Sequence, residues 1–207
     1  MITVEVNVGR VELRLAAGEL CCPGCGGGLT GWGWARLRRV RGLNSSVRPR
    51  RARCTPCRVT HVLLPVVLLV RRAYAAAVIG AVLTAKGARG WGFRRIAAVM
   101  GIPESTVRAW LRRMAGRADA VRGLFTALAA DQGMGPPSPA GSVWADLLAA
   151  LGALAAAVRG FSARSAAGGG VVEVPVWTVA VAVSGGRLLA PGWPGPAHRV
   201  VATPTGL

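Results

Sequence analysis

Four cysteines form the chemically most informative pattern in this sequence of 207 residues. They make two CxxC pairs, Cys22 with Cys25 and Cys54 with Cys57, separated by 28 residues. Zinc binds four thiolates in a tetrahedron at about 2.3 Å, and each CxxC turn can present two of them. The separation exceeds the common interval of about 15–20 residues, so we expect an arginine-rich hairpin to fill it. The pattern predicts one structural Zn²⁺ per chain, with no open position for a catalytic water.

Two nearby residues could alter this ligand set. Cys21 could replace Cys22, although only Cys22 keeps the CxxC spacing. His61 lies four residues after Cys57 and could also bind the metal, although a hydrogen bond near the site is its simpler role. A redox CxxC would open a helix in a βαβ unit, and the glycine- and arginine-rich flanks of these pairs disfavour that alternative.

A second pattern occupies residues 93–113, which read FRRIAAVMGIPESTVRAWLRR. Ile96 and Ala97 mark the inward face of one helix, and Gly101 can take the positive φ of a tight turn. Val107 and Trp110 give the following helix its buried stripe. The spacing predicts a helix-turn-helix.

Two features should complete this unit. The apolar segment around Ala73 to Leu83 is expected to supply the first of three helices. Ser105 or Glu104 is expected to serve the exposed amides at the start of the last helix.

The outward side of the last helix is the expected DNA contact. Residues near the start of such a helix face base edges, and later arginines reach phosphates. We expect base contacts from Glu104, Ser105, Thr106, Arg108 and Ala109. Phosphate contacts are expected from arginines of both helices and of the cysteine module: Arg94, Arg95, Arg112, Arg113, Arg50, Arg51 and Arg53. The alternative is a small helical domain with a solvated basic face.

Basic residues are concentrated in one segment of the chain, whose formal net charge is +18. Residues 36–117 contain nineteen Lys or Arg and one acid, Glu104, whereas the rest contains seven of each. GC-rich codon usage explains abundant arginine beside a single lysine, Lys86, but it does not explain the loss of acids from the same segment. The distribution predicts a polyanionic partner, and double-stranded DNA is the one we expect.

Three runs of sequence resemble an uncharacterised family of high-GC bacteria: CPGCGGGLTGWGWARLRRVRG, RRARCTPCRVTHVLLP and RRIAAVMGIPESTVRAWLRR. Members of that family pair a zinc ribbon with a transposase-like, homeodomain-like helix-turn-helix, and they resemble the N-terminal part of some insertion-sequence proteins. The resemblance covers about residues 1–115 and extends weakly through Ser184–Pro191. It implies the same architecture and DNA binding, and it names no pathway.

The expected fold class is mainly α with a small β zinc ribbon. A zinc-ribbon module should occupy residues 1–66, and a helix-turn-helix domain residues 67–117. An Ala-rich helical C-terminal region is expected at 118–190, with a Gly/Pro linker at 131–142 and an irregular tail at 191–207. Within the first module, alternation predicts a strand over Ile2–Val8, followed by a strand or a helical turn up to Gly18.

Three expectations concern the C-terminal region. Val143–Val158 reads as a helix, and Ala166–Gly170 should interrupt it. Glu173–Ser184 fits a helix better than a strand, because Pro175 lies near its start and glycines follow its end.

The sequence favours a cytoplasmic protein without a membrane partner. The N-terminal run MITVEVNVGRVELRL lacks the apolar region of a secretory signal. The most apolar runs, at 62–70, 73–85 and 143–158, are interrupted or fall short of the roughly 20 residues of a membrane span. No small-molecule substrate is expected, and a homo-oligomer is left open.

Binding rather than catalysis is the expected function. After the helix-turn-helix the only acids are Asp119, Asp131, Asp146 and Glu173, too scattered for a two-metal nuclease or transposase site. The leading interpretation is a transcriptional regulator or a transposase-like accessory protein of a mobile element. The alternatives are a partial or inactive transposase, and a zinc-ribbon module that binds RNA or an acidic protein.

Overall fold

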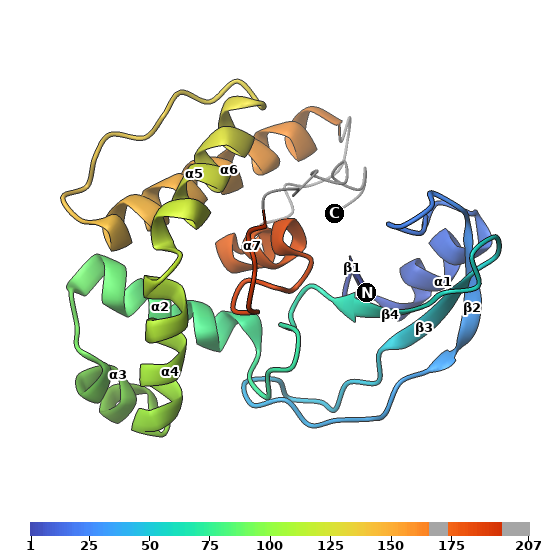
Figure 1. Cartoon of the computed structure of the whole chain (residues 1–207), viewed down its shortest axis with the longest axis horizontal. Coiled ribbons are helices and arrows are strands. Elements are labelled where there is room, and N and C mark those ends of the chain that lie inside the picture. Colours follow the sequence, from blue (N-terminus) through green and yellow to red (C-terminus); the bar gives the residue numbers. More distant parts are fainter. Residues whose placement is uncertain (166–173, 196–207) are drawn as a thin grey trace.

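The computed structural model describes residues 1–165 and 174–195, which form seven helices and one four-stranded sheet (Figure 1). The strands are β1 (Ile2–Val4), β2 (Leu29–Trp34), β3 (Arg50–Cys54) and β4 (Thr60–Pro65). The helices are α1 (Val8–Ala16), α2 (Ala76–Arg89), α3 (Phe93–Met100), α4 (Glu104–Ala115), α5 (Ala118–Ala130), α6 (Val143–Ser165) and α7 (Val176–Ser184).

The sheet has the order β1-β4-β3-β2. β1 runs parallel to β4, whereas β3 pairs antiparallel with both β2 and β4. The helix α1 packs against this sheet, and together they enclose a small core of Val4, Val11, Leu15, Leu20, Cys22, Leu29, Ala52, Cys54 and Leu63. The arginine-rich interval between the cysteine pairs therefore forms antiparallel strands, as the spacing predicts.

The start of the chain corrects the strand expected over Ile2–Val8. The strand ends at Val4, and α1 begins at Val8. The reason is a helix cap: the side-chain oxygen of Asn7 accepts a hydrogen bond from the backbone N–H of Arg10 at 3.1 Å. An asparagine in this position satisfies one of the free amides of a helix start, so it ends the strand pattern despite the continued alternation.

A larger core joins the helices α2 to α7. It includes residues on both sides of the expected boundary between 117 and 118, such as Trp110 in α4 and Phe125 in α5. The helix α2 lies close to its neighbours, because a Cβ at Gly80 would collide with the Trp177 ring of α7 and one at Gly87 with Leu148 of α6. The expected C-terminal region is thus packed onto α2.

Two expectations about the helical unit need correction. Residues before Ala76 are not helical, since Leu68 and Ala75 form an isolated β-bridge, and α2 extends to Arg89 rather than ending near Leu83. The start of α4 has Pro103 at the N-cap position with no side-chain cap. Glu104 lies in the first turn of α4, where a negative charge still interacts favourably with the helix dipole.

The C-terminal elements follow the sequence pattern. The predicted helix at Val143 runs further than expected, to Ser165, and α7 confirms the helical alternative for the segment ending at Ser184. An exposed loop separates α5 from α6, and the predicted break at Ala166–Gly170 and the tail after 195 lie outside the described residues. Among the described residues one helix, α6, is long and apolar enough to cross a membrane, but Leu147, Leu151 and Leu154 place one of its sides in the helical core.

Candidate metal centre and nucleic-acid interface

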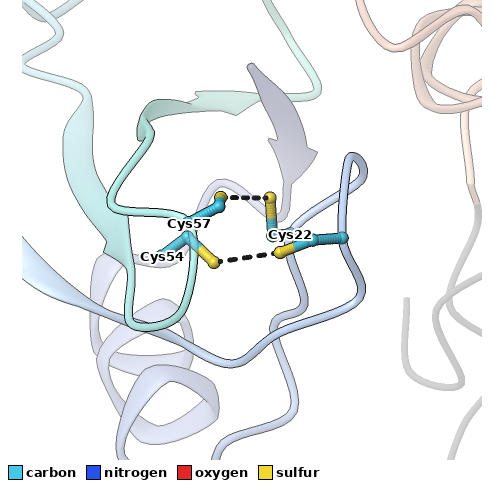
Figure 2. A group of neighbouring side chains, drawn as sticks. Cys22, Cys54 and Cys57 are labelled. Atoms are coloured by element: carbon cyan, nitrogen blue, oxygen red, sulfur yellow. Dashed lines mark hydrogen bonds between the residues drawn. The ribbon is translucent and has the colours of Figure 1, made fainter.

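The two cysteine pairs converge at one point beside the sheet (Figure 2). The four sulfur atoms of Cys22, Cys25, Cys54 and Cys57 lie within 4.8 Å of one another. Cys22 Sγ is 3.8 Å from Cys57 Sγ, and Cys25 Sγ is 3.4 Å from Cys54 Sγ. A tetrahedron with metal–sulfur distances of about 2.3 Å has edges of about 3.8 Å, so the cluster has the size of a four-thiolate metal site.

Both cysteine turns have the same backbone geometry. The N–H of Gly26 donates to the Cys22 carbonyl at 2.8 Å, and the N–H of Arg58 donates to the Cys54 carbonyl at 3.0 Å. The residue after each CxxC takes a left-handed conformation, with φ of 73° at Gly26 and 63° at Arg58. The second turn forms the end of the β3–β4 hairpin. Two equivalent turns facing each other present their thiols from opposite sides.

The electrostatic surroundings differ between the two buried sulfurs. Backbone N–H groups of Gly24 and Cys25 lower the pKa of the Cys22 thiol to about 6, and the His61 side chain adds to this effect. Burial raises the pKa of the Cys54 thiol to about 12. Hydrogen bonds to a sulfur favour its thiolate, which is the form that binds metal. A metal ion bound at this cluster would supply the corresponding stabilisation for the Cys54 thiolate.

The two alternative ligands lie outside the cluster. Cys21 is exposed and pairs with Gly28 in an isolated bridge. His61 is buried, and its Nε2 lies 3.3 Å from Cys22 Sγ while its Nδ1 lies 3.2 Å from the Met1 amino group. His61 therefore contacts the sulfur of Cys22 and can orient it.

The helices α3 and α4 meet at a left-handed glycine. Gly101 has a φ of 61°, and its N–H donates to the Ala97 carbonyl in the last turn of α3. Pro103 occupies the N-cap position of α4. The residues expected to hold this unit together, Ile96, Ala97, Val107 and Trp110, are all buried. Tyr74, which precedes α2, packs its ring edge-on against Trp110 with centroids 5.0 Å apart.

The expected base-contacting residues lie along one exposed stretch of α4. Glu104, Ser105 and Arg108 are exposed, while Thr106 and Ala109 are half-buried. Of the expected phosphate contacts on these helices, Arg94, Arg95 and Arg112 are exposed and Arg113 is half-buried.

Of the three sheet arginines, Arg50 has a carboxylate partner. Its Nε lies 2.6 Å from Glu12 of α1, and its Nη1 donates to the Gly33 carbonyl at 2.7 Å. Arg51 is exposed, and Arg53 donates from Nε to the Arg58 carbonyl at 3.1 Å. Arg51 and Arg53 are therefore the sheet arginines free of carboxylates within the described residues.

Arginines of the basic segment pack on aromatic rings. Arg53 lies 4.5 Å from the Trp32 ring centre and Arg50 lies 5.0 Å from that of Trp34. Around the start of α3, Arg89 and Arg95 flank Trp91, and Arg94 and Arg108 flank Phe93. Such contacts fix a guanidinium without neutralising it, so its N–H groups stay available to an anion. The expected site did not include these aromatic residues, although the run GWGW was a visible signal.

Two further arginines were also missed. Arg72 donates to the Leu189 carbonyl at 2.8 Å, and Arg117 donates to the carbonyls of Ala190 and Trp193. Burial lowers the pKa of both side chains, and the nearby charge of Arg113 lowers it further. These arginines hold the segment after α7 against the helical unit, a long-range role that local sequence does not encode.

Comparison with known proteins identifies a similarity in this same region. A family model described as a domain of unknown function, DUF6431, matches residues 22–110. Over these residues the chain resembles that domain. The matched range includes all four cysteines of the cluster, the sheet arginines, α3 and the first half of α4. No curated protein and no solved structure matches the chain.

Proposed function

We propose that this chain is a DNA-binding protein in which α3 and α4 form a helix-turn-helix and the four cysteines hold a structural zinc ion. The observation that carries the proposal is the exposed arginine surface of α4. The left-handed turn at Gly101 and the buried apolar side of α4 hold this helix in place. The resemblance to zinc-ribbon and transposase-like helix-turn-helix proteins supports the same function.

The charge distribution favours duplex DNA as the partner. No Asp or Glu occurs between Glu19 and Glu104, a stretch that contains all three sheet arginines and all of α3. The major groove of B-DNA, about 12 Å wide, admits an α-helix, and arginine recognises guanine there through two hydrogen bonds. Arg108 is on the second turn of α4, where a recognition helix contacts bases, and Arg112 follows one turn later.

The metal in this proposal is structural. Four sulfurs fill a tetrahedral shell, so a zinc ion held there has no vacant position for a substrate or a water. It would connect the turn before β2 to the turn between β3 and β4, and so stabilise a sheet whose core is small.

The proposed function is binding without a catalytic step. Asp119 lies 3.5 Å from Arg122 on the same helix, and Asp146 accepts a hydrogen bond from the Ala140 N–H at the start of α6. Each of these carboxylates is engaged by a group close to it in the sequence. The role of a regulator or of a mobile-element accessory protein fits such a molecule.

The salt dependence of duplex binding tests the proposal. Each phosphate contact contributes about −0.9 to the slope of log K against log salt. We expect Arg112→Ala and Arg94→Ala each to flatten that slope by about 0.9, measured by fluorescence anisotropy with a labelled duplex. Arg10→Ala is the matched control, because Arg10 is an exposed arginine on α1, outside the basic segment. Equal slopes for all three variants would contradict the proposed interface.

A further inference from the structure

The outer edge of the sheet carries exposed tryptophans with arginines over their rings, and duplex binding by α4 does not use them. β2 is an edge strand, and its pairing with β3 slips between Gly31 and Gly33. Trp32 is the extra residue of this bulge. Its side chain is 53% exposed, and both of its neighbours in the chain are glycines. A bulge commonly redirects a side chain at a sheet edge. Here it leaves a large aromatic ring open to solvent.

One arginine supports this ring. The Arg53 guanidinium carbon lies 4.5 Å from the Trp32 ring centre, and its Nε is held by the Arg58 carbonyl. Arg53 is thereby fixed on the ring while its remaining N–H groups stay available.

A second aromatic side chain lies two residues further along the strand. Trp34 is 40% exposed, and Arg50 lies 5.0 Å from its ring centre. Arg50 is itself fixed by Glu12 of α1 and by the Gly33 carbonyl. A Cβ at Gly31 would collide with the Arg50 guanidinium, so the glycine is needed for this placement. Both tryptophans are thus held in place and exposed, on opposite faces of the sheet: Trp34 on the face of Arg50 and α1, Trp32 on the face of Arg53.

The surroundings of these rings are positively charged. Arg51 is exposed on β3 next to Gly33 in the register, and Arg58 is exposed at the hairpin end. No carboxylate of the described residues besides Glu12 pairs with an arginine of β2 or β3. A partner protein would have to be strongly acidic to match this charge. Nucleic acid supplies both the negative charge and flat rings for stacking.

We propose that the β2–β3 ribbon, residues 29–34 and 50–54, binds unpaired DNA by stacking a base on Trp32, which shares its face with Arg51 and Arg53. Bases in an intact duplex are already stacked on each other and cannot lie on this ring, whereas an unpaired base can. Arg51 and Arg53 would contact the adjacent phosphates. The choice of DNA over RNA rests on the proposed function, because the major groove of an RNA duplex is too narrow for α4.

The ribbon lies far from the helices that we propose bind duplex DNA. Figure 1 places α3 and α4 at one end and β2 at the other. One end would therefore bind a duplex and the other an unpaired stretch, so the preferred ligand is a duplex that continues into single-stranded DNA.

Binding of the full-length, zinc-loaded protein to a labelled oligothymidylate and to a labelled duplex tests the proposal. We expect Trp32→Ala to weaken oligothymidylate binding about 5- to 150-fold, the usual loss for one base–aromatic stack. Its duplex affinity should stay unchanged, and Trp32→Phe should restore most of the loss. Leu37→Ala is the matched control, since Leu37 is an exposed apolar side chain following the same strand.

A second variant keeps the test valid if Trp32→Ala fails to fold. Arg51→Ala should flatten the salt slope for oligothymidylate by about 0.7, the value for one contact to a single strand. Oligothymidylate binding that is unchanged in both variants would overturn the ribbon proposal. Duplex binding that remains sensitive to Arg108→Ala in the same experiment would leave the proposed function standing. Tighter binding of an oligouridylate that also depends on Trp32 would overturn the choice of DNA.

Discussion

At the scale of single residues, left-handed backbone positions determine where the binding elements turn. Gly101 joins α3 to α4 with a φ of 61°, and Gly26 closes the first cysteine turn in the same conformation. Arg58 occupies the equivalent place in the second turn, where a side chain normally costs about 1–2 kcal/mol. Its backbone carbonyl also fixes Arg53 over Trp32, so this position contributes to the sheet surface as well as to the metal centre.

Gly101 and Gly116 form a matched pair for testing the turn. A Cβ at Gly101 meets no atom within 4 Å, so Gly101→Ala should destabilise the fold by about 1 kcal/mol through backbone strain alone. Gly116 ends α4 with a φ of −67°, where alanine is unstrained and should stabilise by about 0.4–1 kcal/mol. Urea denaturation of both variants measures the difference. If both substitutions changed the free energy of unfolding in the same direction, the left-handed conformation of Gly101 would not be what makes glycine necessary at this turn.

Residue spacing alone was enough to predict the cysteine cluster. Two CxxC pairs can close a tetrahedron whatever the intervening chain does, so local sequence contains the whole signal. The Arg50–Glu12 and Arg53–Trp32 contacts were not predictable in this way. They join residues 38 and 21 positions apart, and they depend on the register between strands and the packing of α1.

At the scale of elements, the sheet and the helices have separate cores. The sheet core contains Cys22 and Cys54 themselves, whereas the helical core includes no cysteine. A third small cluster of Val40, Leu64, Leu68 and Ala75 lies between β4 and the start of α2, and β1 contacts α7, where the Thr3 hydroxyl donates to the Ala182 carbonyl at 3.4 Å. Loss of the metal should therefore affect the sheet first.

Metal removal tests whether the sheet and the helices are stabilised separately. We expect one zinc per purified chain by elemental analysis, and Cys54→Ser should lose it because a tetrahedral site needs four ligands. The amides of β2–β4 should lose hydrogen-exchange protection, while those of α2 and α4 keep theirs. Cys21→Ser should retain the zinc, since Cys21 lies outside the cluster. Zinc retained by Cys54→Ser, or a disulfide in its place, would contradict the assignment.

Elements with strong periodicity could be predicted, and elements set by distant packing could not. The helices α3 and α4 follow their apolar periodicity, the Ala/Leu composition indicates α6, and Pro175 and Gly185 mark α7. The helix α1 was only one of two alternatives, because a nine-residue segment can satisfy strand and helix patterns alike. The parallel pairing of β1 with β4 spans about 60 residues, and nothing local to β1 indicates it.

At the scale of the whole molecule, arginines without acidic neighbours extend over two surfaces at opposite ends. Close positive charges destabilise a fold, so a basic segment this free of acids indicates an anionic partner that compensates for them. The structure limits the repulsion by placing guanidinium groups over tryptophan and phenylalanine rings and against backbone carbonyls. The same groups remain able to bind phosphate. Charge, turn and exposed helix are the observations that support the function we propose, sequence-selective binding of DNA.

Loss of selectivity in Arg108→Ala is the most direct test of this claim. A duplex selected by the zinc-loaded protein from a random pool is compared with a scrambled duplex of equal length and composition. If Arg108 contacts a guanine through two hydrogen bonds, the substitution should lower the selected-to-scrambled affinity ratio by the equivalent of about 1–3 kcal/mol. Arg112→Ala should weaken both duplexes equally and leave the ratio unchanged. A ratio that Arg108→Ala does not alter would show that α4 is not the element that reads DNA.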